Sequence, residues 1–280
     1  MNRKQIIETA IRKITFGKKA LTELELPFNI VDKEIFQLEH LMKDIFINIH
    51  AKRLINNKDL RELNKAYQLA KKAHDKTGAI RKGSGRPYIH HPLAVTVYAM
   101  HLAELMNFKD INLKHLLLGA LYHDTIEDTR IFNTKDSGKQ FSKFARKYGS
   151  RFGIVLYYVT KIPLNIDPIL KKLENHIKRV HLVIFENDFV PLEARIIKIA
   201  DRMMNLADTQ HYTHEKIVKT VYFTEKHFQP VLKYMPANIL SIFWSHLTHI
   251  KRAYNITEED LHNYQENLKL SESFELAGEE

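Results

Sequence analysis

Helical spacing of apolar residues is the feature that most restricts the fold of this chain. Apolar side chains recur three or four positions apart over long stretches, which places them on one face of a helix. Residues 29–50 give the clearest example, with apolar positions at Ile35, Leu38, Leu41, Met42, Ile45 and Ile49. Only 9 glycines and 8 prolines occur in 280 residues, about half the usual share of turn formers. The sequence therefore predicts an all-α bundle rather than a sandwich or barrel.

The same periodicity predicts most of the helices and a simple division of the chain. Helices are expected over 29–50, 60–74, 92–105, 112–123, 139–160, 169–185, 192–207, 214–235 and 237–253. The glycine-rich stretch 78–87 interrupts the pattern and is expected to be a loop. We expect a catalytic core at 60–236, preceded by an N-terminal helical extension at 1–59. Residues 237–280 are expected to form a C-terminal helix and an acidic tail.

The net charge of +10 indicates an anionic partner but does not identify it. Residues 257–280 carry one basic and eight acidic side chains, so the rest of the chain is more basic, at +17. A basic body concentrates anions near its surface. That anion could be nucleic acid, lipid or a small polyphosphate, and a merely solvated helical surface explains the charge about as well. No zinc-finger spacing or RNA-binding signature is present, so DNA is not an expected partner.

The chain contains no cysteine, which excludes disulfides, thiolate nucleophiles and iron–sulfur clusters. A bound metal would therefore need His, Asp or Glu ligands. No stretch approaches the length of a membrane span, and the N-terminus lacks the apolar run of a signal peptide. We expect a cytoplasmic protein that does not insert into a membrane. The sequence does not decide the oligomeric state, and a homo-oligomer is compatible with it.

Three separated positions place ionisable groups within apolar helices, where they are costly unless paired or metal-bound. The adjacent pair His90 and His91 lies where the glycine-rich loop meets a helix. His123 and Asp124 end a nearly continuous apolar run, and Asp201 interrupts another. Two imidazoles and two carboxylates suit a divalent ion such as Mn²⁺, Fe²⁺ or Zn²⁺. A single buried histidine is more often a packed core residue, so each position alone is weak.

Further polar residues follow these positions at helical spacing. If the helix continues, Glu127 lies one turn beyond His123 and Asp128 one turn beyond Asp124. Carboxylates beside a metal can orient a water molecule or move its proton, which suits hydrolysis. A solvent-exposed acidic helix end is the simpler alternative. Asn205 and Asp208 follow Asp201 by four and seven positions, so this polar stripe is expected to face a cavity.

Taken in order, these motifs resemble the HD-domain hydrolases of the RelA/SpoT type, and most closely the small alarmone hydrolases. The resemblance covers about residues 60–230. Its motifs are Arg81-Lys82, Pro87-Tyr88-Ile89-His90-His91-Pro92, His123-Asp124-Thr125-Ile126-Glu127-Asp128-Thr129 and Lys198-Ile199-Ala200-Asp201-Arg202-Met203-Met204-Asn205. The contexts around the histidines and aspartates are more specific than a bare His…His-Asp…Asp pattern, which would indicate only the large HD superfamily.

The resemblance implies an all-α HD-domain bundle that removes the 3′-pyrophosphate of guanosine tetra- or pentaphosphate, giving GDP or GTP. It implies one metal, usually Mn²⁺, with His91, His123, Asp124 and Asp201 as ligands. Glu127 and Asp128 match the catalytic acidic pair. The residues matching substrate contacts are Arg81, Lys82, Arg86, Lys161 and Asn205. His90, which does not precede the proline, is expected in a second shell or facing solvent.

Two positions depart from the family pattern and keep other functions open. Met204 replaces a usual His or Tyr, and Ala207 stands where an Arg is frequent. We expect both changes to affect substrate contacts rather than metal binding. One alternative is therefore an HD hydrolase acting on another nucleotide or on a phosphorylated dinucleotide cofactor. A second is a nucleotide sensor without catalysis, although the complete set of ligands and carboxylates argues against it.

Overall fold

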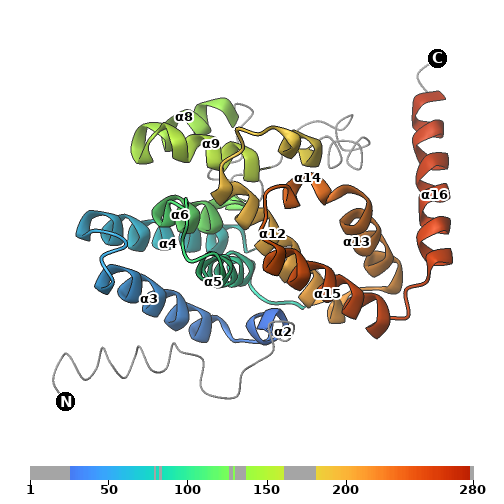
Figure 1. Ribbon diagram of the computed structural model, residues 1–280, viewed down its shortest axis with the longest axis horizontal. Helices are drawn as coiled ribbons and strands as arrows, with labels where there is room; N and C mark the ends of the chain where they lie inside the picture. The colour runs from blue at the N-terminus through green and yellow to red at the C-terminus, as the bar shows by residue number, and fades with distance from the viewer. Residues whose placement is uncertain are drawn as a thin grey trace.

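The computed structural model describes residues 26–78, 80–81, 84–125, 129, 137–160 and 181–277, and within these ranges the predicted all-α fold is confirmed (Figure 1). The described residues form no strand, only an isolated bridge between Ile80 and Pro87 in the glycine-rich loop. No helix in the described part of the chain is long and apolar enough to cross a membrane.

The first half of the fold contains α2 (Leu26–Val31), α3 (Ile35–Ala51), α4 (Asn57–Thr77), α5 (His90–Leu105), α6 (Leu113–Tyr122), α8 (Ser137–Tyr148) and α9 (Ser150–Val159). The second half contains the short 3₁₀ turns η2 (Ile184–Glu186) and η3 (Asp208–His211), and the helices α12 (Leu192–Ala207), α13 (His214–His227), α14 (Gln229–Leu232), α15 (Ala237–Ala253) and α16 (Glu258–Ala277).

Helices α5 and α12 lie at the centre of the bundle. They pack against each other and both pack against α6, while α3 covers α5 and α9 covers α12. Nearly every side chain of α5 is buried, because neighbouring helices surround it. Gly119 of α6 permits a close approach to α12: a Cβ at this position would lie 2.5 Å from Cδ1 of Ile197. This contact brings the C-terminal end of α6 towards the middle of α12.

Two long helices expected from the sequence are each broken into two. The helix expected over 139–160 becomes α8 and α9, because Gly149 adopts a φ of 103° that other residues rarely adopt. The helix expected over 214–235 becomes α13 and α14, with the break at Phe228, two residues before Pro230. Proline disfavours a continuous helix because it lacks an N–H donor. Most of the helix expected over 169–185 lies outside the described residues.

The described part of the N-terminal extension belongs to the main hydrophobic core. Leu26 and Ile30 of α2 and Leu38, Met42 and Phe46 of α3 are almost completely buried in the same cluster as α5, α6 and α12. A second cluster joins α13, α15 and α16. Burial of this kind is the main stabilising contribution to a helical bundle. Residues 26–51 thus provide part of the scaffold that holds the centre in place.

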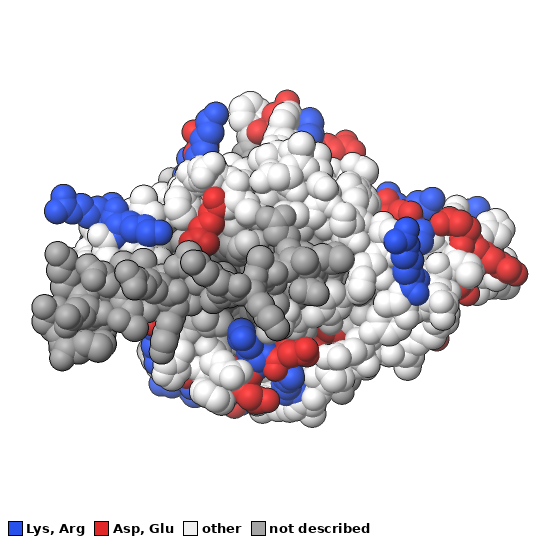
Figure 2. Space-filling model, turned by 60° about the horizontal axis from the view of Figure 1, so that its bottom comes forward, with Lys and Arg blue, Asp and Glu red and all other residues white. Residues whose placement is uncertain are grey.

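Charge on the face drawn in Figure 2 is mixed in sign. Lysine and arginine side chains lie among aspartate and glutamate side chains, with uncharged surface between them, over the described atoms seen in that view. A continuous basic band, which would suit a nucleic-acid backbone, does not cross those atoms. Four basic side chains instead line a cavity beside α12.

Candidate metal centre

Three helices bring four of the predicted residues together. His91 lies in the first turn of α5, and His123 and Asp124 follow directly after α6. Asp201 lies in the middle of α12. Because α5, α6 and α12 pack against one another at the centre, side chains 110 positions apart in the sequence meet in space.

The four side chains point their polar atoms at one another. Nε2 of His91 lies 3.0 Å from Oδ1 of Asp201 and 3.5 Å from Oδ2 of Asp124. Nε2 of His123 lies 3.2 Å from Oδ2 of Asp124 and 3.9 Å from Oδ1 of Asp201. One ligand atom from each of His91, His123 and Asp201 falls within 4.8 Å of the others, a spacing that could hold a metal ion.

His123 is oriented in the way a metal ligand requires. Its Nδ1 lies 2.8 Å from the carbonyl oxygen of Ala120 and donates a hydrogen bond to it. In the neutral ring that bond leaves Nε2 without a proton and directed at the carboxylates. His123 is completely buried, and its Nε2 has no hydrogen-bond partner of acceptable geometry despite the nearby Asp124. A buried nitrogen left in this state is costly unless a further group binds it.

The electrostatics of the site follow from burial and close opposite charges. Burial lowers the pKa of His123, but Asp124 and Asp201 outweigh it and raise that pKa to about 9. Burial and the nearby Arg81 guanidinium lower the pKa of His91 to about 4. Burial raises the pKa of Asp201, but Lys198 and the two histidines reverse this and hold it well below the usual range. Burial also raises the pKa of Asp124, but His123 and His91 outweigh it and hold that pKa far below the usual range, so both carboxylates stay ionised at neutral pH.

The residues of the predicted polar stripe, Asp201, Asn205 and Asp208, lie in two different environments. Nδ2 of Asn205 donates to Oδ1 of Asp201 at 2.7 Å, and both residues line a cavity. Asp208 is instead buried, accepts a hydrogen bond from Nε of Arg81 at 2.9 Å and forms an ion pair with Nη2 of Arg81 at 2.8 Å. Arg81 also donates to Oδ1 of Asn205 at 3.2 Å. The structure thus places Arg81 in a buried network that reaches Asp201 through Asn205.

Of the remaining predicted residues, the structure describes Arg86 and His90. Arg86 donates to the backbone carbonyl of Val31 in α2. His90 is buried rather than solvent-facing, because it packs beneath α2 and its Nε2 lies 2.9 Å from the carbonyl oxygen of Lys33. The predicted catalytic pair Glu127 and Asp128, and the predicted substrate contacts Lys82 and Lys161, lie outside the described residues.

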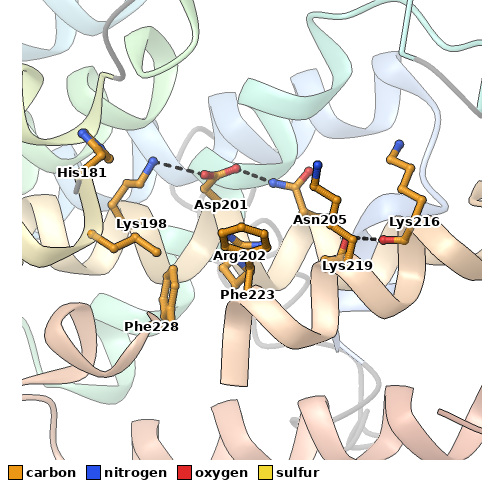
Figure 3. Close-up of a pocket in the computed structure, with 11 residues that line it drawn as sticks. His181, Lys198, Asp201, Arg202, Asn205, Lys216, Lys219, Phe223 and Phe228 are labelled. Atoms are coloured by element: carbon orange, nitrogen blue, oxygen red, sulfur yellow. Dashed lines mark hydrogen bonds and ion pairs between the residues drawn. The ribbon is translucent and has the colours of Figure 1, made fainter. Parts of the chain in front are cut away.

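A cavity of about 400 Å³ lies beside Asp201, between α12 and α13 (Figure 3). Its lining includes Lys198, Asp201, Arg202 and Asn205 of α12 and Lys216 and Lys219 of α13. The sequence interpretation missed Lys216 and Lys219, because lysines on an amphipathic helix usually form a solvated face. Their spacing of three positions, which places them on one side of α13, is the signal that could have found them.

Comparison with known proteins supports the family assignment. A family model described as HD domain matches residues 88–206, which include all four central side chains. A guanosine-3′,5′-bis(diphosphate) 3′-pyrophosphohydrolase of Aquifex aeolicus is 31% identical over 171 residues, covering 61% of this chain and 21% of that protein. A GTP pyrophosphokinase of Streptomyces coelicolor is 31% identical over 187 residues, covering 66% and 19%. The chain contains an HD domain of the RelA/SpoT type. It spans about a fifth of the length of these curated relatives.

An HD domain implies a divalent metal, and the residues of this one fit such an ion. The unsatisfied, buried Nε2 of His123 and the converging carboxylates of Asp124 and Asp201 form a donor set of nitrogen and oxygen atoms. That set matches the preference of first-row divalent ions. A bound dication would also relieve the repulsion between the carboxylates of the buried Asp124 and the partly buried Asp201.

The two departures from the RelA/SpoT pattern lie in the core of the HD domain. Met204 is completely buried and Ala207 is 2% exposed, and both belong to the main hydrophobic cluster. Neither residue lines the cavity beside Asp201. The expectation that these changes alter substrate contacts is therefore not supported, because both side chains pack on the side of α12 that faces other helices.

Tyr88 contacts Asp124, one of the predicted metal ligands, from outside the centre. Its hydroxyl donates to Oδ2 of Asp124 at 3.3 Å, and its ring stacks on His74 with centroids 5.3 Å apart. The change Tyr88→Phe keeps the stack and removes the hydrogen bond. We expect Mn²⁺ affinity to fall about 10- to 100-fold, as is typical when a ligand loses an outer partner. Calorimetric titration of both proteins would measure it, and equal affinities would exclude this role for Tyr88.

The pKa values of four histidines predict how the stability of the metal-free protein depends on pH. Burial lowers the pKa of His74, His91 and His101 to about 4. Unfolding lets these rings bind protons, so stability should rise from pH 4 to about 6.5. The pKa of His123 is raised to about 9, so its contribution is complete below pH 6.5 and is lost as the pH rises to 9.

The expected result is a maximum near pH 6.5 in the free energy of unfolding, measured by urea titration in the presence of a chelator. Saturating Mn²⁺ serves as the control, because a bound ion requires neutral His123 and should remove the decline above pH 6.5. Stability that continues to rise between pH 6.5 and 9 in chelator would contradict the prediction.

Proposed function

We propose that this chain hydrolyses guanosine tetra- or pentaphosphate in a Mn²⁺-dependent reaction, releasing the 3′-pyrophosphate and leaving GDP or GTP. The convergence of His91, His123, Asp124 and Asp201 beside a cavity lined with cations is the observation that carries the proposal. In this proposal the metal centre and the cavity for the polyanionic substrate share Asp201 and therefore lie side by side. The likeness to a relative named as a 3′-pyrophosphohydrolase supports the same substrate. We retain residues 60–236 as the proposed catalytic unit.

In this proposal His91, His123, Asp124 and Asp201 would hold the ion. When bound, it would lower the pKa of a water molecule and neutralise charge on the phosphate. Glu127 and Asp128 orient the attacking water and accept its proton. The water oxygen bonds to the phosphorus nearest the ribose, and the bond from that phosphorus to the ribose 3′ oxygen breaks. The 3′ oxygen takes up a proton, and pyrophosphate leaves with the oxygen of the water.

The chain's own side chains also position the reacting groups. Asn205 bridges Arg81 and Asp201 by hydrogen bonds of 3.2 and 2.7 Å, which fixes the carboxylate of Asp201 relative to the glycine-rich loop. Lys198 lies 3.5 Å from Oδ2 of Asp201 and also donates to the carbonyl of Val159. Rigid positioning of this kind lowers the cost of reaching the transition state. Lys82 and Lys161 remain proposed substrate contacts from the sequence.

The decisive experiment is incubation of the purified chain with Mn²⁺ and guanosine 3′,5′-bis(diphosphate), with detection of pyrophosphate and GDP. Metal-dependent release of both products is expected. GTP with ATP is tested in parallel, because one of the similar proteins is named as a GTP pyrophosphokinase. Tight nucleotide binding without release would favour a sensor. Turnover only of other 3′-phosphorylated nucleotides or dinucleotides would replace the proposed substrate.

A further inference from the structure

The cavity between α12 and α13 has an uneven distribution of charge. Four basic side chains line it, Lys198, Arg202, Lys216 and Lys219, whereas Asp201 is the one acidic residue among its described lining. In Figure 3 Lys198 lies on one side of Asp201, and Asn205, Lys216 and Lys219 lie on the other. Asp201 also belongs to the metal centre, so an anion in the cavity would lie beside the reacting groups.

The two cations of α12 already have partners within the protein. Lys198 contacts Asp201 and the carbonyl oxygen of Val159. The guanidinium of Arg202 lies 5.3 Å from the centre of the Phe228 ring, and burial lowers its pKa. These contacts fix both groups and satisfy part of their charge. On the α13 side, two more cations, Lys216 and Lys219, line the same cavity.

Lys216 and Lys219 of α13 are placed differently. Lys219 is half-buried and forms no ion pair with any other described residue, and Lys216 is exposed, with its ammonium group 3.2 Å from the centre of the Tyr212 ring. A half-buried ammonium without a countercharge attracts anions more strongly than an exposed one, because water screens it less. Lys216 and Lys219 lie three positions apart on α13 and both line the cavity, a spacing that suits the two phosphates of a diphosphate.

The arginines that the sequence indicated for substrate binding are already engaged. Arg81 is buried and paired with Asp208, and Arg86 donates to the carbonyl of Val31. A guanosine polyphosphate carries two separate anionic groups, and only one of them can occupy the metal centre. The second group needs cations of its own.

We propose that Lys216 and Lys219 bind the phosphate groups of the substrate that are not attacked, which for a guanosine polyphosphate are the 5′-phosphates. This assignment rests on the proposed function. It makes α13 the helix that selects nucleotides with phosphate groups on both the 3′ and the 5′ position of the ribose. A nucleotide without 5′-phosphates then reaches the same metal centre but loses the contribution of these two lysines.

The test combines variants with two substrates. Wild type, Lys216→Ala/Lys219→Ala and Lys226→Ala are assayed with guanosine 3′,5′-bis(diphosphate) and with guanosine 3′-diphosphate that lacks 5′-phosphates. Lys226 is exposed on the same helix but does not line this cavity, so it is a control for general charge. We expect the double variant to raise KM for the first substrate about 10- to 100-fold. Its KM for the second substrate should equal that of the wild type, and kcat should change little.

Two further measurements separate this inference from the proposed function. If the wild type hydrolyses neither substrate, the proposed function fails, and titration with GDP still tests the lysines. At least a tenfold weaker GDP affinity in the double variant supports them, whereas equal affinity, or no GDP binding by the wild type, overturns the inference. Lys219→Arg should retain most of the binding because it keeps the charge. An equal rise in KM for both substrates, or no rise for either, also overturns it.

Discussion

The change Asp124→Asn is expected to abolish metal-dependent hydrolysis. Oδ2 of Asp124 lies 3.2 Å from Nε2 of His123 and 3.5 Å from Nε2 of His91, so it faces both histidines across the space where an ion would bind. Asparagine keeps the size of the side chain and removes its charge. Loss of an outer partner of a ligand can lower metal affinity about 100-fold. Loss of the Asp124 charge should lower Mn²⁺ affinity by more than that. Calorimetric Mn²⁺ titration and pyrophosphate release would measure the two effects.

Asp208→Asn is the matched control for this variant. Asp208, the first residue of η3, is also a buried carboxylate, but its partner is Arg81 rather than a histidine of the centre. Leaving a buried arginine without its partner should cost about 3–5 kcal/mol in the free energy of unfolding. Mn²⁺ affinity should change far less than in Asp124→Asn. If both variants lose Mn²⁺ equally, the assignment of Asp124 as a ligand fails.

The change Glu127→Gln is expected to lower kcat about 10²- to 10⁴-fold while Mn²⁺ affinity stays within a few-fold of the wild type. Proton transfer by a positioned side chain contributes an acceleration of that size. Glutamine can still orient a water molecule but cannot accept its proton. Steady-state kinetics and metal titration on the same preparation separate the two properties. The prediction rests on the spacing of Glu127 from His123 in the sequence.

Asp128→Asn completes this comparison, because the two carboxylates share the proposed role. A smaller loss in one variant would identify the other residue as the main proton acceptor. A parallel fall in Mn²⁺ affinity and kcat in Glu127→Gln would instead make Glu127 a ligand. Unchanged kcat in both variants would remove the acidic pair from the mechanism and leave hydrolysis to the four central residues and the ion.

Much of the site could be predicted from the sequence because burying a charged or polar group is costly. His123, Asp124 and Asp201 stand within apolar helices, where an unpaired group would destabilise the fold. Those positions therefore indicated a shared site before their distances were known. The choice of His91 over His90 needed the resemblance to a family. In the structure Nε2 of His91 faces the carboxylates of Asp124 and Asp201, whereas Nε2 of His90 lies 2.9 Å from the carbonyl oxygen of Lys33.

The cations could not be assigned in the same way. A lysine or arginine on a helix is compatible with solvent, an ion pair or a ligand, and its local sequence does not distinguish them. Arg81 resembled a substrate contact, yet the fold pairs it with Asp208, 127 positions later in the chain. Lys216 and Lys219 resembled a solvated face, yet packing of α13 near α12 places them in a cavity beside Asp201.

Helical periodicity and the cost of burying charge can be read from the sequence alone, and they predicted the all-α class, the central helices and the residue types of the proposed ligand set. Only the tertiary structure decided where the helices break, how residues 26–51 contribute to the core and which cations face the cavity. Those outcomes depend on contacts between segments far apart in the chain. The close packing of α6 against α12 at Gly119, which brings His123 towards Asp201, is one such contact.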